Sequence, residues 1–156
     1  MRRSKWLGVV AILSALALAA CADDEPRLGN PLDTPEAPPP PGLDPALVAL
    51  GERVYADNCA ACHRPDLSGD PDWTTPNPDG SYPPPPHDSS GHTWHHPDGL
   101  LFEIIRDGTG FEQTRMPIFA GVLGDEEIRA VIEFFKSRWG TEERAFQWQV
   151  TWQDGP

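Results

Sequence analysis

The chain has 156 residues, and its 24 acidic side chains outnumber its 12 lysines and arginines, so the formal net charge is −12 at pH 7. Proteins that bind nucleic acid neutralise phosphates with clustered basic residues, and this acidic composition therefore argues against nucleic acid as a partner. The 19 prolines and an apolar N-terminal segment leave only part of this length for one folded domain.

Residues 1–20 have the organisation of a secretory signal peptide. Arg2, Arg3 and Lys5 precede an apolar run that begins at Trp6, and small residues end the segment. A retained transmembrane helix is the alternative, but the apolar run is shorter than the ~20 residues that cross a bilayer. We therefore predict export, and loss of these residues leaves the mature chain still more acidic.

The four residues Leu18-Ala19-Ala20-Cys21 resemble the lipobox of bacterial lipoproteins. The resemblance implies that Cys21 carries a lipid after the preceding residues are removed, which would hold the protein at a membrane surface without a span. An ordinary signal peptide that leaves Cys21 unmodified is the alternative. The expectation is a lipid-anchored protein in the periplasm of a Gram-negative envelope.

Residues 21–43 are rich in proline and acidic residues, include four consecutive prolines at 38–41, and contain little that can form a core. This composition is typical of a linker. Because a polyproline chain rises ~3.1 Å per residue, a tether of this length reaches up to roughly 60 Å from its anchor.

Three segments within residues 44–140 carry apolar side chains at helical spacing, which predicts one all-α domain. The helices are expected at 44–59, 98–107 and 124–139. Asp44 is a favourable N-cap ahead of Pro45, Gly108 stops the second helix, and acidic residues begin the third.

The segments beside these helices lack a helical pattern. Residues 64–97 are rich in proline and histidine, and they predict a long extended surface loop, a kind of segment that is often functional. In the C-terminal extension, residues 141–156, large apolar residues alternate with polar ones from Phe146 to Trp152. This period of two predicts an extended C-terminal strap that covers part of the core.

The motif Cys59-Ala60-Ala61-Cys62-His63 has the spacing of covalent haem attachment. Its two cysteines can bond both vinyl groups of one porphyrin, and the adjacent histidine reaches the iron as an axial ligand. The alternatives are a thioredoxin-like redox pair, which follows a strand, and a zinc site, which needs a second pair of ligands. The helix before the motif favours one haem c.

Met116 is the candidate for the sixth iron ligand. Met1 is lost with the signal peptide, so Met116 is the single methionine of the predicted mature chain, and it lies in a loop rich in glycine and proline. A methionine that fills the core is the alternative. Ligation by histidine and methionine raises the reduction potential, which suits a carrier on the high-potential side of respiration.

The order of helix, CAACH, loop, helix, RMPIFAG and acidic helix start resembles a class I monohaem c-type cytochrome over residues 44–140. The resemblance implies the all-α fold of that family, in which three main helices surround a covalently attached haem. It also implies that Gly51 and Tyr55 face Phe135 and Trp139 where the first and last helices cross. Members of the family carry electrons, so we expect no enzyme activity.

Four histidines of the long loop depart from a minimal class I cytochrome: His87, His92, His95 and His96. We interpret them as polar residues that cap the second helix and line the haem crevice. The alternatives are contacts with the haem propionates, an added copper or zinc site, and competition with Met116 for the iron.

The leading functional hypothesis is a single-electron carrier whose haem edge near Cys59 and Cys62 exchanges electrons with a partner protein. The acidic charge favours a basic docking surface on that partner, such as a respiratory complex, an oxidase or a copper enzyme. One rival is a haem enzyme or a gas or redox sensor in which Met116 dissociates. Another rival is a fixed cytochrome subunit of an oxidase complex.

Overall fold

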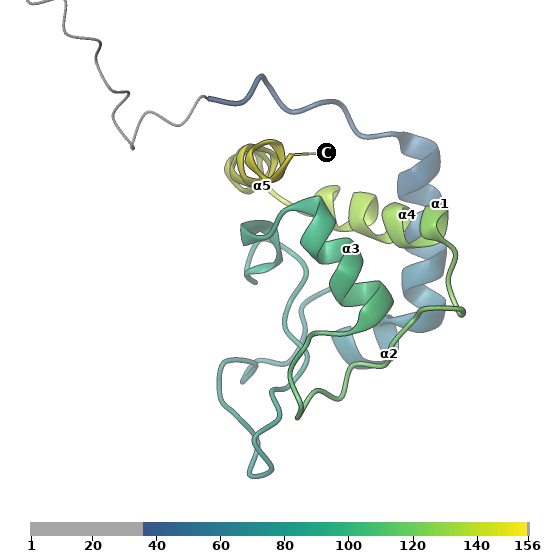
Figure 1. Ribbon diagram of the computed structural model, residues 1–156, viewed down its shortest axis with the longest axis vertical. Helices are drawn as coiled ribbons and strands as arrows, with labels where there is room; N and C mark the ends of the chain where they lie inside the picture. Colours follow the sequence, from purple (N-terminus) through teal and green to yellow (C-terminus); the bar gives the residue numbers. More distant parts are fainter. Residues whose placement is uncertain (1–35, 156) are drawn as a thin grey trace, which may run out of the picture. The chain divides into compact units, whose positions relative to one another are not determined.

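The computed structural model describes residues 36–155, and this part of the chain is helical without a β-strand. The helices in chain order are α1 (Pro45–Asn58), α2 (Ala60–His63), the 3₁₀ helix η1 (Thr93–His95), α3 (Asp98–Asp107), α4 (Asp125–Lys136) and α5 (Thr141–Asp154) (Figure 1). The predicted signal peptide, Cys21 and the tether up to residue 35 lie outside the described residues. None of the helices between 36 and 155 is long and apolar enough to cross a membrane.

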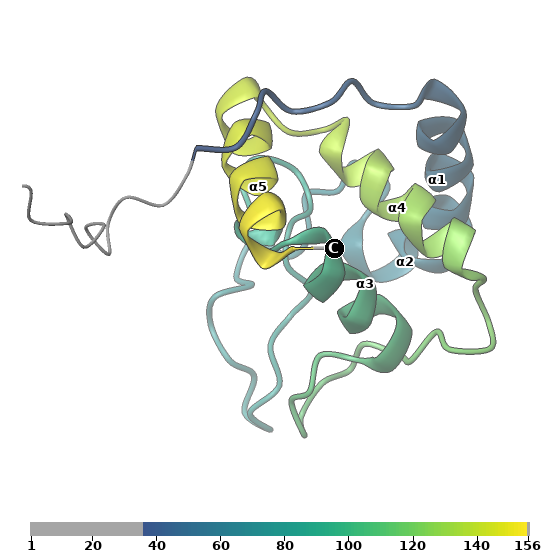
Figure 2. The ribbon, with the colours of Figure 1, turned by 45° about the horizontal axis from the view of Figure 1, so that its top comes forward.

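α1 and α4 cross at the centre of the core (Figures 1 and 2). α1 starts where the sequence predicted, because Asp44 Oδ1 accepts a hydrogen bond from the Ala46 N–H at 2.8 Å. At the crossing, Gly51 lies directly against the Ala130 carbonyl, with no space for a Cβ atom. The close approach of the two backbones therefore depends on this glycine.

Aromatic rings fill the rest of the crossing. The Tyr55 ring centroid lies 5.4 Å from that of Phe134 and 5.9 Å from that of Phe135. The expected contact of Tyr55 with Phe135 is confirmed, whereas Gly51 faces Ala130 and Phe134 instead of Phe135 and Trp139. The difference is about one helical turn along α4.

α3 begins and ends at the predicted residues, and Gly108 stops it with a φ of +98°. The chain then forms a long loop to α4 and returns along the end of α3. The Phe119 N–H donates to the Ile105 carbonyl at 3.3 Å, and the Ala120 N–H donates to the Arg106 carbonyl at 2.8 Å. These bonds fix the C-terminal limb of the loop that carries Met116.

The prediction of an extended strap over residues 141–156 is wrong, because this segment forms α5. The buried contact of α5 is polar. Gln147 is 2% exposed, and its Nε2 donates to Asp98 Oδ1 at 2.6 Å. Lys136 Nζ binds the other oxygen of Asp98 at 2.6 Å. Because the buried residue of α5 is a glutamine, the apolar residues of this segment do not show a helical period in the sequence.

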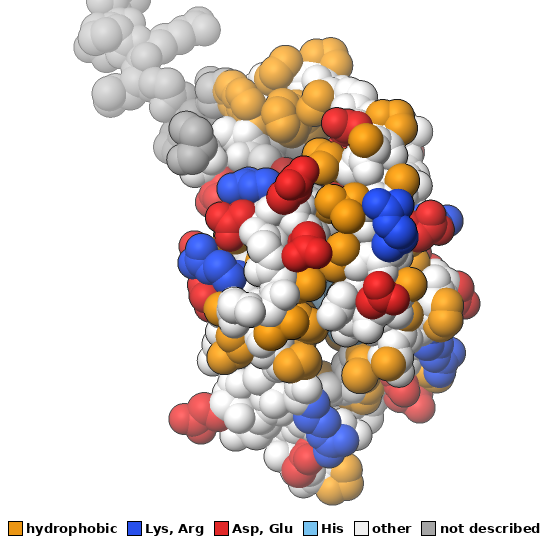
Figure 3. Space-filling model, turned by 90° about the vertical axis from the view of Figure 1, so that its right-hand side faces the viewer, with side chains coloured by type: hydrophobic (Ala, Val, Ile, Leu, Met, Phe, Trp, Pro, Cys, Tyr) orange, Lys and Arg blue, Asp and Glu red, His pale blue; other side chains and the backbone are white. Residues whose placement is uncertain are grey.

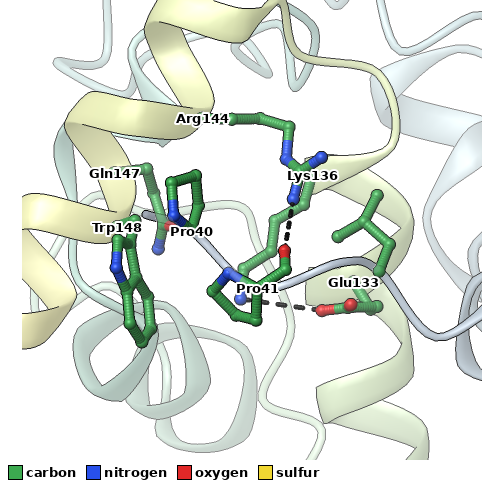
Figure 4. A pocket seen from close by; sticks show the side chains of 8 residues that line it. Pro40, Pro41, Glu133, Lys136, Arg144, Gln147 and Trp148 are labelled. Carbon is green, nitrogen blue, oxygen red and sulfur yellow. Dashed lines mark hydrogen bonds and ion pairs between the residues drawn. The ribbon is translucent and has the colours of Figure 1, made fainter. Parts of the chain in front are cut away.

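Residues 36–43, named here the proline segment, pack on α5 and on the end of α4, although they were predicted as tether (Figure 4). Three hydrogen bonds join the segment to α5: the Ala37 N–H to Gln149 Oε1 (2.7 Å), Trp148 Nε1–H to the Pro38 carbonyl (2.6 Å), and Arg144 Nη2–H to the Pro41 carbonyl (2.9 Å). The folded unit therefore begins near residue 36, ahead of the predicted boundary at residue 44.

The long loop between α2 and α3 is partly buried and not only a surface segment. Leu67 and Thr93 are 1% and 4% exposed. Two hydrogen bonds of 2.8 Å join its limbs: the His87 N–H to the Leu67 carbonyl, and the Asp70 N–H to the Pro84 carbonyl. Gly69 lies between Leu67 and Asp70 in the chain and has a φ of +60°. It is so close to Pro85 and Pro86 that a Cβ atom at this position would overlap their backbone.

Candidate haem site

The CxxCH motif is presented by the junction of α1 and α2. Cys59 caps the end of α1, and its carbonyl accepts hydrogen bonds from Cys62 N–H at 3.1 Å and His63 N–H at 3.0 Å. The motif therefore forms one helical turn. Cys62 is exposed, and Cys59 packs against the core.

His63 is 8% exposed, and its Nδ1 lies 2.9 Å from the Pro85 carbonyl. A carbonyl oxygen only accepts, so Nδ1 carries the proton and Nε2 keeps its lone pair for a metal. Burial lowers the pKa of His63, which favours this neutral form. Sequence reasoning missed the role of Pro85, because a backbone carbonyl leaves no signal in the residue type.

The thiol chemistry of Cys59 argues against the redox-pair alternative. Burial, and in addition the neighbouring Cys62, raises the pKa of Cys59 to about 11. Cysteines of thiol–disulfide exchange are instead activated by a lowered pKa. The preceding element is also the helix α1 and not a strand.

Met116 lies half-buried in the loop between α3 and α4, and its side chain packs against the same hydrophobic core as Cys59. Its N–H donates to Thr114 Oγ1 at 3.2 Å, and the guanidinium of Arg115 pairs with Asp79 of the long loop. The structure thus brings Met116 and the CxxCH motif to one core, while Cys21 lies outside the described residues.

The donors at this core fit a haem. Two thiols with the required spacing, an imidazole with a bare Nε2 and a thioether are the protein groups of a c-type site. In addition, Trp94 Nε1 and His92 Nδ1 are buried without a hydrogen-bond partner in the part of the chain that the structure describes. An indole N–H needs an acceptor, which the described residues do not supply to Trp94.

The four loop histidines have different surroundings. The His87 ring stacks on that of His63 at 4.2 Å, whereas the His92 ring stacks on Trp73 at 5.0 Å. His95 is exposed beside Trp94. Across residues 36–155, no three His, Cys, Asp or Glu side chains gather in a way that could hold a metal ion. The geometry therefore gives no support to an added copper or zinc site.

Comparison with known proteins decides the family, because the sequence model of the family described as Cytochrome c matches residues 48–139. The chain belongs to the cytochrome c family. The matched region includes the CxxCH motif and Met116, and it ends before α5. This c-type cytochrome has the expected all-α class I fold, and its family carries covalently bound haem that transfers electrons.

A curated relative of this cytochrome is the cbb3-type cytochrome c oxidase subunit FixPc of Rhizobium leguminosarum bv. viciae. The two are 32% identical over 97 residues, which is 62% of this chain and 30% of the relative. The cytochrome thus corresponds to less than a third of that protein's length. No solved structure matches the chain.

Proposed function

We propose that this cytochrome is a single-electron carrier with one haem c, bonded to Cys59 and Cys62 and ligated by His63 and Met116. The observation that carries the proposal is the state of His63. It is buried, its Nδ1 proton is held by the Pro85 carbonyl, and its Nε2 is left for iron. A hydrogen bond of this kind fixes the tautomer and the ring orientation of a histidine that binds a metal.

The residues of the chain serve electron transfer by holding the iron and excluding water from it. Bound haem supplies an iron that alternates between Fe(III) and Fe(II). His63 and Met116 would hold the iron together and leave it no site for a substrate, so no enzyme activity is expected. The hydrophobic core against which Cys59 packs includes Ile105 and Phe135. Such apolar surroundings would disfavour the more highly charged ferric state.

The ligand assignment is tested by the ferric spectrum and the potential. Met116→Ala should remove the weak ferric absorption band of the sulfur–iron bond and lower the reduction potential. Ile118→Ala is the matched control, because Ile118 is 60% exposed two residues further on, and this variant should keep both properties. An unchanged spectrum and potential in Met116→Ala would show that another group is the sixth ligand.

We further propose that the carrier works at the periplasmic face of a membrane, anchored by a lipid on Cys21. The signal-peptide pattern and the lipobox support this location. Wild-type protein should fractionate with membranes, and Cys21→Ser should appear in the soluble periplasmic fraction. Ala22→Ser, next to the lipobox cysteine, should remain with the membranes. Membrane retention of Cys21→Ser would contradict the anchor.

An oxidase or another respiratory complex is the proposed partner, and the name of the FixPc relative supports this class. The loop that carries Met116 exposes Phe111, Ile118 and Val122 at 75%, 60% and 66%. Charges of both signs and apolar side chains intermingle on the face drawn in Figure 3.

Because the net charge is −12, electron transfer to a basic partner should slow as ionic strength rises. A rate that is independent of salt would refute electrostatic docking.

A fixed cytochrome subunit of an oxidase is the second candidate, favoured by the same relative. The two functions differ in how the protein leaves the membrane. After extraction with mild detergent, a free carrier should migrate alone, and a fixed subunit should co-purify with oxidase activity.

A further inference from the structure

His87 lies between the candidate axial ligand and the core. One side of its ring stacks on His63, with centroids 4.2 Å apart and planes 30° apart. Its ring also stacks on Phe135 of α4, at 4.3 Å and 21°. The rings of His63, His87 and Phe135 therefore form one stack that connects the CxxCH turn to the central helix.

The backbone of His87 is held on both sides. Its N–H donates to the Leu67 carbonyl at 2.8 Å, and its carbonyl accepts a hydrogen bond from Trp139 Nε1–H at 2.9 Å. The loop position of His87 is thus tied to the start of the long loop and to the turn between α4 and α5. Its ring has little freedom to leave the stack.

A hydroxyl group determines the tautomer of His87. Thr93 is 4% exposed, and its Oγ1 donates its single proton to the Pro86 carbonyl at 3.2 Å. The same oxygen lies 2.8 Å from His87 Nδ1, so it must accept there, and Nδ1 must donate. Nδ1 of His87 consequently carries a proton, and the ring plane is fixed.

The two stacked histidines are oriented by consecutive residues of the loop. The Pro85 carbonyl holds Nδ1 of His63, and the Pro86 carbonyl holds Nδ1 of His87 through Thr93. A single hydrogen bond leaves an imidazole free to tilt about that bond. A ring packed on its face removes this remaining freedom.

We propose that His87 is a positioning residue that sets the plane of the His63 imidazole at the haem iron, with Thr93 as the group that locks it. The inference rests on the proposed ligation of iron by His63. A leucine in place of His87 would fill the volume but could neither stack nor bond Thr93. The orientation of an axial ring determines the splitting of the iron d orbitals, so ferric spectra report on it directly.

The test compares three holoprotein variants: His87→Leu, Thr93→Val and the control His95→Leu. Thr93→Val is nearly isosteric and removes only the hydroxyl, and His95 is an exposed histidine of the same loop. Ferric electron paramagnetic resonance and the spread of the haem methyl resonances in proton NMR are measured at equal haem content. Far-UV circular dichroism checks that the fold is retained.

We expect His87→Leu and Thr93→Val to shift or broaden the largest g value and to change the methyl spread, while His95→Leu matches wild type. Wild-type signals in Thr93→Val would overturn the inference even if His87→Leu failed to acquire haem. An equal shift in His95→Leu would also overturn it. Absence of the sulfur–iron band from wild type would instead refute ligation by Met116. The comparison of variants would still report on the orientation of the His63 ring.

Discussion

Gly69 offers a sharp test of how the long loop positions the acceptor of His63. Its φ is +60°, and a Cβ atom built on it would overlap the backbone of Pro85 and Pro86. Gly69→Ala should therefore push away the segment whose carbonyl holds Nδ1 of His63. The change acts on the axial ligand through the backbone alone.

The expected loss of stability is the sum of two unfavourable effects and one favourable effect. A non-glycine residue in the left-handed region costs ~1–2 kcal/mol. Overpacking against a backbone that cannot move aside costs a further ~1–3 kcal/mol. The alanine also stiffens the unfolded chain, which offsets ~0.4–1 kcal/mol. We therefore expect Gly69→Ala to lower the free energy of unfolding by about 1–5 kcal/mol.

Gly80→Ala is the matched control, because Gly80 has a φ of +82° but its Cβ would meet only Gln113 Cγ at 3.7 Å. This variant should suffer the left-handed strain and no overlap. Thermal unfolding of the two holoproteins, followed by circular dichroism, gives the difference, at roughly 3–5 °C per kcal/mol for a domain of this size. If Gly69→Ala unfolds at the same temperature as Gly80→Ala, the tight packing of Gly69 on the proline backbone is refuted.

Gly51→Ala should lower the free energy of unfolding by ~1–2 kcal/mol, because overlap with the backbone of α4 outweighs the gain in helix propensity. The control Gly99→Ala should be neutral or stabilising, because its Cβ meets only a flexible side chain. Thermal denaturation compares them, and equal midpoints would contradict the close crossing. The pKa of Asp79 is lowered by hydrogen bonds from the Ser81 hydroxyl and a guanidinium. A carboxyl whose pKa is lowered by folding stabilises the fold at pH values above its unfolded pKa of ~3.9, and this stabilisation is lost as the pH falls. Acidification should therefore destabilise wild type more than Asp79→Asn. A pH series of melting curves tests this, and parallel curves would refute it. Gln147→Leu should free α5 by leaving its buried partners unpaired, at a cost of ~1–3 kcal/mol, and limited proteolysis should then cleave α5 first. Wild-type resistance to protease would show that α5 is held by other contacts.

Helix ends with local causes could be predicted from the sequence. Asp44 ahead of Pro45, Gly108 after Asp107 and the acid-rich start of α4 each fix a boundary within a few residues of the chain. The CxxCH motif is local in the same sense. Its match to the Cytochrome c family model confirms the interpretation of the domain as a c-type cytochrome.

Features that depend on distant partners could not be predicted. α5 is attached through Gln147 to Asp98, 49 residues earlier, so its buried residue is polar and the apolar pattern indicates a strand instead. The stack of His87 on His63 likewise joins residues 24 positions apart. A proline carbonyl binds Nδ1 of His63 directly, and another binds the Thr93 hydroxyl that holds Nδ1 of His87. Backbone acceptors of this kind are invisible in a sequence.

Docking of the proline segment on α5 changes the local concentration that an anchored carrier experiences. If Cys21 carries the proposed lipid, only about fourteen residues remain between anchor and domain, and they reach at most ~43 Å in place of roughly 60 Å. The volume that the haem can sample scales with the cube of this length and falls about threefold, so its effective concentration at a neighbouring membrane complex rises by a similar factor. In such an anchored protein, the residues of α5 that bind the proline segment would set how often the domain meets its membrane partner.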